Sequence, residues 1–381
     1  MTKTKILLCG PPISALGGGP THIRNLLASP LQRRYVFINF ETGSRGIESP
    51  AQEEKAISKI LRLVTSPVAL AWQILRLRPA VVHLNSAMDN RAFWRDALYL
   101  VVAKLLRQKV VFQLHGGSLD IVGTRRWRLR LVRNLLALAD AVVLLANSEQ
   151  RDFTALGLAE SLVVIPNGVD VRQYSAAGSK NHNGKIRRLA YLGRLMREKG
   201  IFESIQALEV LRSDPRFKNL ELRIAGSGPA QAELERYIRD HGLGDIVKLV
   251  GSVFGEDKVK FLREADLFLF PSYHQEGLPY SILESLAAGT PVVASKVAGI
   301  PDVVVNRVHG ILVDPKDPAA IVMAVFELAQ SEDVFRAMSD QCMDWAAQKL
   351  SLERLATQFE DLYERVRSNR IAHDRPAHPP L

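Results

Sequence analysis

The sequence predicts an α/β protein built from two successive doubly wound domains, each with its own parallel sheet. Short β-branched runs alternate with longer segments of helical period, which is the pattern of βαβ units. A polar, small-residue stretch over residues 175–186 interrupts the alternation, which then restarts. The 381 residues suffice for two domains of ordinary size. We therefore expect a first domain over 1–174, a linker over 175–186 and a second domain over 187–350.

The first domain is expected to hold six strands with helices between them. The expected strands are Lys5–Cys9, Tyr35–Phe40, Ala80–Leu84, Val110–Leu114, Ala141–Ala146 and Leu162–Ile165. The expected helices include His22–Ala28, Arg95–Leu106 and Arg126–Leu138. Because strands joined by crossover helices run the same way, this sheet should be parallel.

The second domain repeats the pattern. The expected strands are Arg188–Leu192, Leu220–Ile224, Val247–Val250, Leu267–Phe270, Pro291–Ala294 and Gly310–Val313. The expected helices are Ile201–Leu211, Ala230–His241, Asp257–Glu264, Tyr280–Ala288, Ala319–Leu328, Val334–Leu350 and Ser351–Arg367. Residues 372–381 are predicted to form a disordered tail.

Composition excludes several classes of protein. Hydrophobic residues make up 47% and charged residues 24% of the chain, which excludes a disordered or collagen-like protein. The two cysteines, Cys9 and Cys342, share no metal-ligand spacing and give no disulfide framework, so we expect a reducing, cytoplasmic compartment. The apolar runs Ile6–Cys9 and Leu63–Leu75 are too short for a signal peptide or a membrane span.

The positive charge is concentrated in the first half. Residues 1–174 hold 23 Lys and Arg against 12 Asp and Glu, a balance of +11, whereas residues 175–381 hold 27 against 28, a balance of −1. A basic half of this kind should meet phosphates, nucleic acid or an acidic membrane surface. Nucleic acid is the weakest of these, since apart from Trp127 the basic runs lack interleaved aromatic residues and no nucleic-acid motif is present.

Two segments of the basic half have the pattern of helices that lie on a bilayer. On the helix expected after residue 125, one arc carries arginines and another carries apolar side chains; these are Arg126, Arg130 and Arg133, and Trp127, Leu131, Leu135 and Leu138. The segment Lys55–Arg78 is also basic and apolar. Both could bind an anionic membrane as a peripheral surface. An ordinary core helix with a solvated basic face is the open alternative.

Ligands of parallel α/β sheets bind at the carboxyl ends of the strands, so the loops there carry the candidate sites. After the first strand, Gly17, Gly18 and Gly19 precede a helix, which favours close approach of an anion, with a plain flexible turn as the open alternative. The spacing is not that of the dinucleotide fingerprint G-x-G-x-x-G. After the fourth strand, His115 stands beside Gly116, where a structural and a functional histidine are both open.

In the second half, Arg194 and Lys199 bracket a turn before a helix. Two cations at a helix start suit a diphosphate, with solvated surface charge as the alternative. Further on, Gly226 and Gly228 weakly resemble a nucleotide loop, but Gln231 stands where a third glycine would be expected.

The segment PSYHQEGLPYSILESLAAGTPVVAS is the most specific. Glu276 ends a loop, Gly277, Leu278 and Pro279 turn into a helix, and Glu284 follows two helical turns later. A carboxylate on this helix could accept both hydroxyls of a ribose, and the backbone N–H groups of its first turn could hold phosphate oxygens.

Taken together, these motifs resemble the retaining glycosyltransferases of family 4. The resemblance runs through the triple-glycine loop, His115 with Gly116, ADAVVLLANS, VIPNGVD over Val164–Asp170, GRLMREKG, IAGSGP and the E-x7-E segment, and covers nearly the whole chain in order. It implies the GT-B fold, with two facing Rossmann-like domains and a cleft between them. It also implies a closing hinge at the linker and a last helix, about 351–368, that packs on the first domain.

The resemblance implies a role for each candidate residue. Glu284 would bind the donor ribose, and Glu276 with the backbone of Gly277, Leu278 and Pro279 would contact the transferred sugar. Arg194 and Lys199 would neutralise the diphosphate, aided by Gly18 and Gly19. His115 would lie by the sugar and acceptor, and the backbone of Ser252, Val253 and Phe254 would line the base. Ser285 departs from the alanine that the family often has there.

The mechanism expected from these features is metal-independent. No two aspartates lie two positions apart, so an Asp-x-Asp metal site is absent from the sequence and the positive charge should come from side chains and helix dipoles. The resemblance implies retention of configuration, best met by a front-face path without an obligatory protein base; Glu276, the one candidate nucleophile, is interpreted as a sugar-binding group. No cofactor is expected beyond the UDP- or GDP-sugar substrate.

We expect a glycan or lipid-linked acceptor in cell-envelope or exopolysaccharide synthesis, with the protein peripheral on the inner face of the plasma membrane. The alternatives are a nucleotide-sugar epimerase of similar architecture and a non-catalytic nucleotide-sugar-binding protein. The E-G-x-P…E segment disfavours the epimerase. The non-catalytic binding protein is disfavoured because the charged site residues are all present, namely Arg194, Lys199, Glu276 and Glu284. An NAD-dependent dehydrogenase is disfavoured by the missing third glycine.

Overall fold

The computed structural model describes residues 3–42, 56–116, 125–175, 185–275 and 277–369, with the backbone alone over 56–64. Contacts divide the chain into two compact units, which we call unit 1 and unit 2. Unit 1 runs to Gly168 and includes the chain from Leu352 onward; unit 2 is Val169–Ser351. Most of the expected linker and the expected tail lie outside the described residues.

Unit 1 contains a six-stranded parallel sheet in the order β2-β1-β3-β4-β5-β6. Its strands are β1 (Thr4–Gly10), β2 (Tyr35–Glu41), β3 (Val81–Ser86), β4 (Val110–Leu114), β5 (Ala141–Leu144) and β6 (Leu162–Val164). Its helices are α1 (Gly18–Ala28), η1 (Pro30–Arg33), α2 (Ala56–Leu77), α3 (Asn90–Leu105), α4 (Arg126–Leu136), α5 (Asn147–Ala155) and α13 (Leu352–Arg367).

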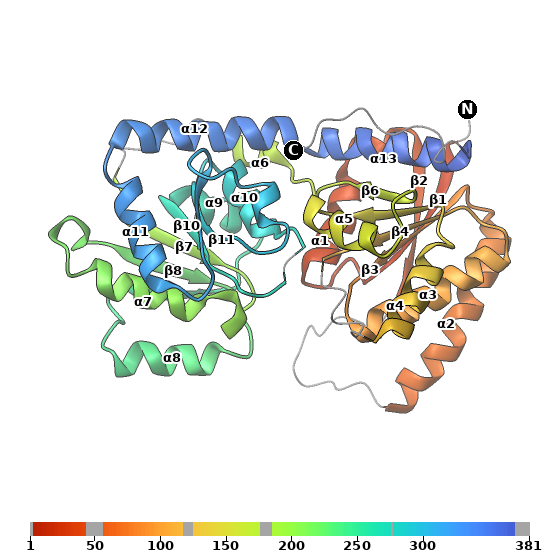
Figure 1. Cartoon of the computed structure of the whole chain (residues 1–381), viewed down its shortest axis with the longest axis horizontal. Helices are drawn as coiled ribbons and strands as arrows, with labels where there is room; N and C mark the ends of the chain where they lie inside the picture. The colour runs from red at the N-terminus through yellow and green to blue at the C-terminus, as the bar shows by residue number, and fades with distance from the viewer. Residues whose placement is uncertain (1–2, 43–55, 117–124, 176–184, 276, 370–381) are drawn as a thin grey trace. The chain divides into compact units, whose positions relative to one another are not determined.

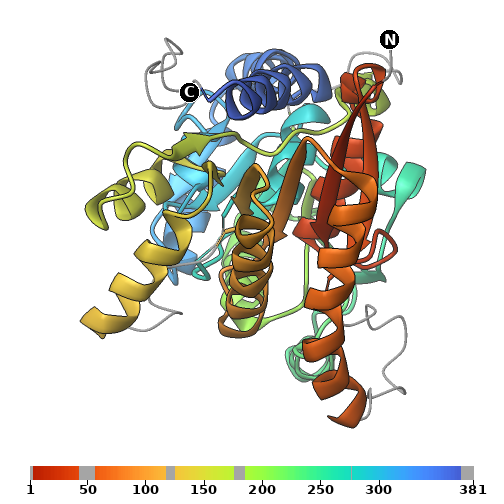
Figure 2. The same ribbon diagram turned by 90° about the vertical axis from the view of Figure 1, so that its right-hand side faces the viewer.

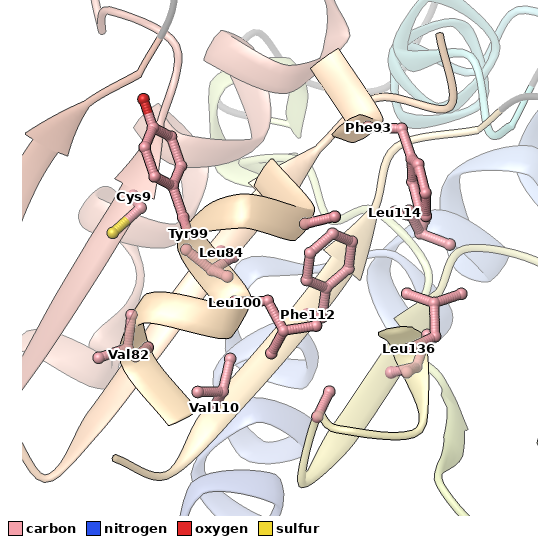
Figure 3. Close-up of a cluster of buried hydrophobic side chains, with 14 of the residues drawn as sticks. Cys9, Val82, Leu84, Phe93, Tyr99, Leu100, Val110, Phe112, Leu114 and Leu136 are labelled. Carbon is pink, nitrogen blue, oxygen red and sulfur yellow. The ribbon is translucent and has the colours of Figure 1, made fainter. Parts of the chain in front are cut away.

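The strands of this sheet are apolar on both faces because helices cover both. Alternate residues of a strand point to opposite sides, so Leu7 and Cys9 of β1 pack with α2, α3 and α4, whereas Ile6 and Leu8 pack with α1 and α13. Figure 3 shows the first of these clusters, in which aromatic and aliphatic side chains of α3 meet those of β3 and β4. The unit is therefore a three-layer α/β/α domain.

The helix α13 closes unit 1 although it lies far along the chain from the sheet. It packs on α1, η1 and β3. Its Tyr363 hydroxyl hydrogen-bonds to Nδ1 of the buried His83 at 2.8 Å, and the Tyr35 hydroxyl donates to Glu364 at 2.9 Å.

Unit 2 contains a second six-stranded parallel sheet, in the order β12-β11-β10-β7-β8-β9. Its strands β7, β8, β10 and β11 are labelled in Figure 1. Its strands are β7 (Arg188–Leu192), β8 (Glu221–Ala225), β9 (Val247–Gly251), β10 (Leu267–Phe270), β11 (Val292–Ser295) and β12 (Gly310–Val313). Its helices are α6 (Val171–Ser175), η3 (Arg197–Lys199), α7 (Ile201–Leu211), η4 (Pro215–Phe217), α8 (Gln231–Asp240), α9 (Gly255–Glu264), α10 (Tyr280–Ala287), η5 (Ile300–Asp302), α11 (Pro318–Leu328) and α12 (Glu332–Lys349).

The prediction of two doubly wound α/β domains is confirmed, and each expected strand is present within two residues of its expected ends. The first unit ends at Gly168 rather than at residue 174, because α6 packs on α9, α10 and α12 of unit 2. The helix α5 was not expected. Its sequence NSEQRDFTA is polar, and of its side chains only Glu149 and Phe153 are buried.

Among the described residues, no helix combines the length and the apolar character that crossing a bilayer requires.

Candidate functional site

The strand order of unit 2 places a topological switch point between β7 and β10. Read from β9, the order β9-β8-β7-β10-β11-β12 is that of the Rossmann fold, in which ligands bind beyond the carboxyl ends of the two central strands. The loop after β7 carries Arg194 and Lys199, and the loop after β10 carries residues 276–279. Two of the predicted donor-binding segments therefore flank the position where this fold binds nucleotides. Glu276 itself lies outside the described residues.

The loops after β7 and β8 are held together by backbone hydrogen bonds. The N–H of Gly193 donates to the carbonyl of Ala225 at 3.1 Å, and that of Leu195 donates to the carbonyl of Ser227 at 3.0 Å. Gly226 has a φ of 138°, and a Cβ there would lie 1.9 Å from the Gly193 carbonyl oxygen; a Cβ on Gly228 would lie 2.4 Å from that of Leu195. Close backbone packing between the two loops therefore requires glycine at both positions, whether or not a nucleotide binds there.

The turn that carries Lys199 is joined to the loop after β10. The carbonyl of Glu198 accepts hydrogen bonds from the backbone N–H of Tyr273 at 2.9 Å and of His274 at 3.1 Å. Gly200 has a φ of 74°, and any side chain there would clash with the carbonyl of Pro271. The expected diphosphate cation and the segment leading to Glu276 therefore belong to one hydrogen-bonded framework.

The cations of this turn differ in their partners. Arg197 forms an ion pair with Glu233, so much of its charge is already neutralised. The Arg194 side chain is exposed and forms no ion pair within the described part of the chain. Lys199 is half-buried. Arg194 is the better placed of the two arginines to meet an anionic ligand.

Glu284 lies on α10, the helix that follows the loop after β10. Its side chain is buried, with 7% of the residue exposed, and it accepts a 2.5 Å hydrogen bond from the ammonium of Lys258 on α9. An ion pair with a neighbouring helix fixes the position of this carboxylate. A group that binds ribose hydroxyls needs such a fixed position. Burial and the Glu284 charge both raise the pKa of the Tyr174 phenol, which stays neutral.

The role of Lys258 was missed by sequence reasoning. Lysine and glutamate are 26 positions apart on different helices, and no spacing rule connects them. Only the packing of α9 on α10 brings them together.

The remaining predicted donor residues line neighbouring strand ends. Ser252 and Phe254 are exposed after β9, with the Ser252 hydroxyl 3.4 Å from that of Ser227, and Val253 is half-buried. Before α10, Leu278 is buried while Gly277 and Pro279 are half-buried. The atypical Ser285 is buried and donates to the carbonyl of Thr290 at 2.8 Å, so its hydroxyl stabilises the end of α10.

Unit 1 has its own switch point, between β1 and β3. The helix α1 begins there, with Gly17 as its N-cap at a φ of 129° and Gly18 and Gly19 in its first turn. A Cβ on Gly18 would meet no atom within 4 Å, and one on Gly19 would make only an ordinary contact with Pro11 at 3.5 Å. Packing within unit 1 therefore gives no reason for these two glycines, whereas close approach of a ligand would.

His115 follows β4 in the same edge of the unit 1 sheet. Its Nε2 lies 2.9 Å from Oδ1 of Asn85, whose amide nitrogen donates to the carbonyl of Cys9 at 3.2 Å. This second bond orients the Asn85 amide so that its oxygen accepts from Nε2–H of His115. Burial, with the neighbouring His22 and His83, lowers the pKa of the His115 imidazole well below its ordinary value. The imidazole is therefore neutral at pH 7.

Two further histidines lie behind His115. The ring centroids of His22 and His115 are 4.8 Å apart, with the ring planes tilted by 57°. Nδ1 of His22 lies 3.2 Å from Oδ1 of Asn167 in the VIPNGVD motif. His83 hydrogen-bonds to Gln113 at 3.0 Å. Burial lowers the pKa of His22 to about 4 and that of His83 to about 3. Sequence reasoning missed both, although the quoted motif already contained the asparagine partner.

Comparisons with known proteins agree with this architecture. Residues 16–173 match the family model described as Glycosyltransferase Family 4, and residues 175–345 match Glycosyl transferases group 1. The amylovoran biosynthesis glycosyltransferase AmsK of Erwinia amylovora is 29% identical over 60% of this chain and 57% of its own length. The putative teichuronic acid biosynthesis glycosyltransferase TuaC of Bacillus subtilis is 28% identical over 69% and 65%.

The chain thus spans under two thirds of the length of both curated relatives. Among solved structures, Anabaena Alr3699/HepE in complex with UDP is similar with a TM-score of 0.74 and 20% identity, over 95% of this chain and all of that one. At this identity the likeness establishes the fold.

Proposed function

Because the chain belongs to glycosyltransferase family 4 and has the GT-B fold, we propose that it moves a sugar from a nucleoside diphosphate donor to a hydroxyl group with retention of configuration. The observation that carries the proposal is the switch point of unit 2. There a Rossmann-ordered sheet presents Arg194 and Lys199 after β7, and α10 after β10 presents the fixed carboxylate of Glu284.

Unit 2 is proposed to bind the donor. The Glu284 carboxylate would accept hydrogen bonds from the two ribose hydroxyls, and the backbone of the exposed residues Ser252 and Phe254 would border the base. Glu276 and Gly277 would contact the transferred sugar. UDP is the first nucleotide to test, since the similar HepE structure was determined with UDP.

The leaving group is proposed to be stabilised by protein charge without a metal. As the sugar departs, negative charge grows on the β-phosphate, and the transition state gains most from cations already in place. Arg194 is exposed and outside any ion pair in the described chain, which supports this role. Lys199 stands on a turn fixed by hydrogen bonds to the loop after β10.

Retention is proposed to follow a front-face path. The bond between the anomeric carbon and the β-phosphate oxygen breaks, the acceptor oxygen bonds to the same face of that carbon, and its proton passes to the departing phosphate. No protein base is needed for this balance. The neutral imidazole of His115 suits hydrogen bonding to a sugar or acceptor hydroxyl better than pairing with a phosphate.

The acceptor is proposed to be a glycan or a lipid-linked intermediate at the inner face of the plasma membrane. The names of AmsK and TuaC, which concern amylovoran and teichuronic acid biosynthesis, support a role in cell-envelope or exopolysaccharide synthesis. The balance of +11 over residues 1–174 supports an anionic surface or carrier as the partner.

A thermal-shift screen against UDP, GDP and ADP and their sugars tests the donor assignment, because specific binding raises apparent stability. The nucleotide sugar that binds is then incubated with acceptors, and the anomeric configuration of the product is read by NMR. Interconversion of the nucleotide sugar without transfer would indicate an epimerase. Binding without any turnover would indicate a sensor. An inverted product would refute the front-face path.

A further inference from the structure

The outward sides of three adjacent helices of unit 1 expose large apolar side chains. On α2, the side chains of Val68, Trp72 and Leu75 are exposed at positions i, i+4 and i+7, which place them on one stripe. Leu70 and Ile74 of the same helix are buried in the core, so the helix already has its inward apolar face. The exposed stripe is therefore additional to what the fold of unit 1 requires.

The helix α4 repeats this arrangement. Val132 and Leu136 face the core, whereas Trp127 and Leu131 are exposed, as is Leu138 just beyond the helix. Trp72 and Trp127 are both 56% exposed. Exposed tryptophans at helical spacing with leucines are typical of surfaces that enter the headgroup region of a bilayer.

The two stripes lie on helices that cover the same side of the unit 1 sheet. The helix α3 lies between α2 and α4 and packs against both (Figure 2), and it exposes Leu98 and Leu105. We call the surface formed by these side chains the α2–α4 face; it consists of Val68, Trp72, Leu75, Leu98, Leu105, Trp127, Leu131 and Leu138.

Arginines accompany the apolar side chains of this face. The Arg76 guanidinium lies over the Trp72 ring at 5.0 Å, and that of Arg128 lies over Trp127 at 5.3 Å. Further exposed arginines on these helices or next to them are Arg78, Arg91, Arg107, Arg125, Arg126, Arg130 and Arg133. In the part of the chain that the structure describes, none of these exposed arginines forms an ion pair.

Acidic residues are nearly excluded from the face. The sequences of α2 and α4 contain no Asp or Glu. The one carboxylate within α3, Asp96, is buried and paired with Arg95 at 2.7 Å. An exposed acid, Asp89, caps the start of α3. The charge of the face is therefore predominantly positive, and it lies among side chains that would gain from leaving water.

We propose that the α2–α4 face binds the surface of an anionic lipid bilayer. The tryptophans and leucines would enter the boundary between headgroups and acyl chains, and the arginines would contact lipid phosphates. A second copy of the chain is a poorer occupant, because a two-fold contact would place like charges against each other. The inference deepens the proposed function by giving a lipid-linked acceptor a surface on which to meet the enzyme.

Vesicle binding tests the surface independently of catalysis. The full chain should co-sediment with phosphatidylglycerol-containing vesicles, bind phosphatidylcholine vesicles weakly, and dissociate at high salt. Replacing Arg126, Arg130 and Arg133 by Gln should weaken binding at least about tenfold, since each basic residue near the surface contributes about fivefold. The matched control replaces three exposed cations of unit 2, Arg212, Arg236 and Arg239, by Gln and should bind as the wild type does.

The apolar contribution is tested by Trp72→Ser with Trp127→Ser, against Met323→Ser with Val334→Ser as the matched exposed pair on unit 2. The tryptophan variant should bind at least about tenfold more weakly, and the control should not change. Acyl-chain-brominated lipids should quench the fluorescence of the wild type and quench the tryptophan variant less.

Equal vesicle binding by the tryptophan variant and the wild type would overturn the proposal, as would the absence of quenching by brominated lipids. The proposal would also be wrong if the substitutions dissociated a dimer of the chain and left vesicle binding unchanged. Affinity for the nucleotide identified in the thermal-shift screen is measured on each variant. Unchanged nucleotide affinity with lost vesicle binding assigns the defect to the α2–α4 face. Normal vesicle binding by a protein that transfers no sugar would leave this proposal standing and refute the proposed function.

Discussion

Replacing Glu284 by Ala tests the donor site most directly. The carboxylate is buried, fixed by Lys258 at 2.5 Å, and proposed to accept the ribose hydroxyls. Hydrogen bonds to a charged group contribute about 1.5–3 kcal/mol, so losing this acceptor should weaken nucleotide binding about ten- to a hundredfold. Isothermal titration of the cognate nucleoside diphosphate measures the loss.

The same substitution should also lower stability, because it leaves the Lys258 ammonium without its carboxylate. Breaking a fully buried pair costs about 3–5 kcal/mol. The Lys258 side chain is 26% exposed and can regain water, so we expect about 1–2 kcal/mol and a melting temperature lower by about 2–8 °C.

Lys258→Met is the matched control, since it removes the ion pair but keeps the carboxylate. It should lower stability at least as much as Glu284→Ala, because the carboxylate that loses its cation is more deeply buried than Lys258, while retaining more of the nucleotide affinity than Glu284→Ala. If the Glu284→Ala protein is folded and binds the nucleotide with wild-type affinity, the ribose assignment is wrong. If both variants lose affinity equally, Glu284 acts only through its structural pair.

Three further predictions follow from particular contacts. Arg194→Ala and Lys199→Ala should each lower kcat about a hundredfold while leaving the affinity for the bare nucleoside unchanged. The steady-state activity of the wild type should persist in EDTA. Loss of activity in EDTA that magnesium restores would contradict the metal-free path. Gly226→Ala should lower the melting temperature sharply, because its Cβ would lie 1.9 Å from a backbone carbonyl oxygen; an unchanged melting curve would refute this packing role. The free energy of unfolding should fall as the pH drops below about 6.5, because histidines of the unfolded chain then bind protons. In the folded protein, the buried His22 and His83 bind protons only at lower pH, near their pKa values of about 4 and about 3. Urea titrations at several pH values measure the free energy of unfolding, which should fall less steeply with decreasing pH in His83→Gln than in the wild type. An equal dependence on pH would count against the assignment.

The strands could be predicted because their sequences are determined by burial on both faces of a parallel sheet. In Val110–Leu114 every residue except Gln113 is apolar, since both faces of the strand are covered by helices. The helix α5 was missed for the opposite reason. Its side chains are largely exposed, so its sequence carries little helical period, and its position depends on tertiary contacts such as the Glu149 carboxylate accepting from the N–H of Leu145.

The candidate site divides in the same way. The positions of Arg194, which follows β7, and of Glu284, on the helix after β10, follow from topology, because a parallel sheet gathers its carboxyl ends at one edge. Partners from other elements do not follow. Neither the pairing of Lys258 with Glu284 nor the packing role of Gly226 has a signature in local spacing, because each depends on how loops and helices far apart in sequence pack.

The electrostatics of the two units favours a division of the chemistry between them. At the switch-point edge of unit 1, burial keeps His22, His83 and His115 neutral, and their hydrogen-bond partners are amides or a hydroxyl. Neutral donors and acceptors of this kind suit sugar and acceptor hydroxyls, but they cannot offset the charge of a departing diphosphate. The corresponding edge of unit 2 presents the side-chain charges of Arg194 and Lys199. The cationic part of transition-state stabilisation should therefore be lost by substitutions in unit 2, whereas substitutions among the unit 1 histidines should alter sugar and acceptor recognition.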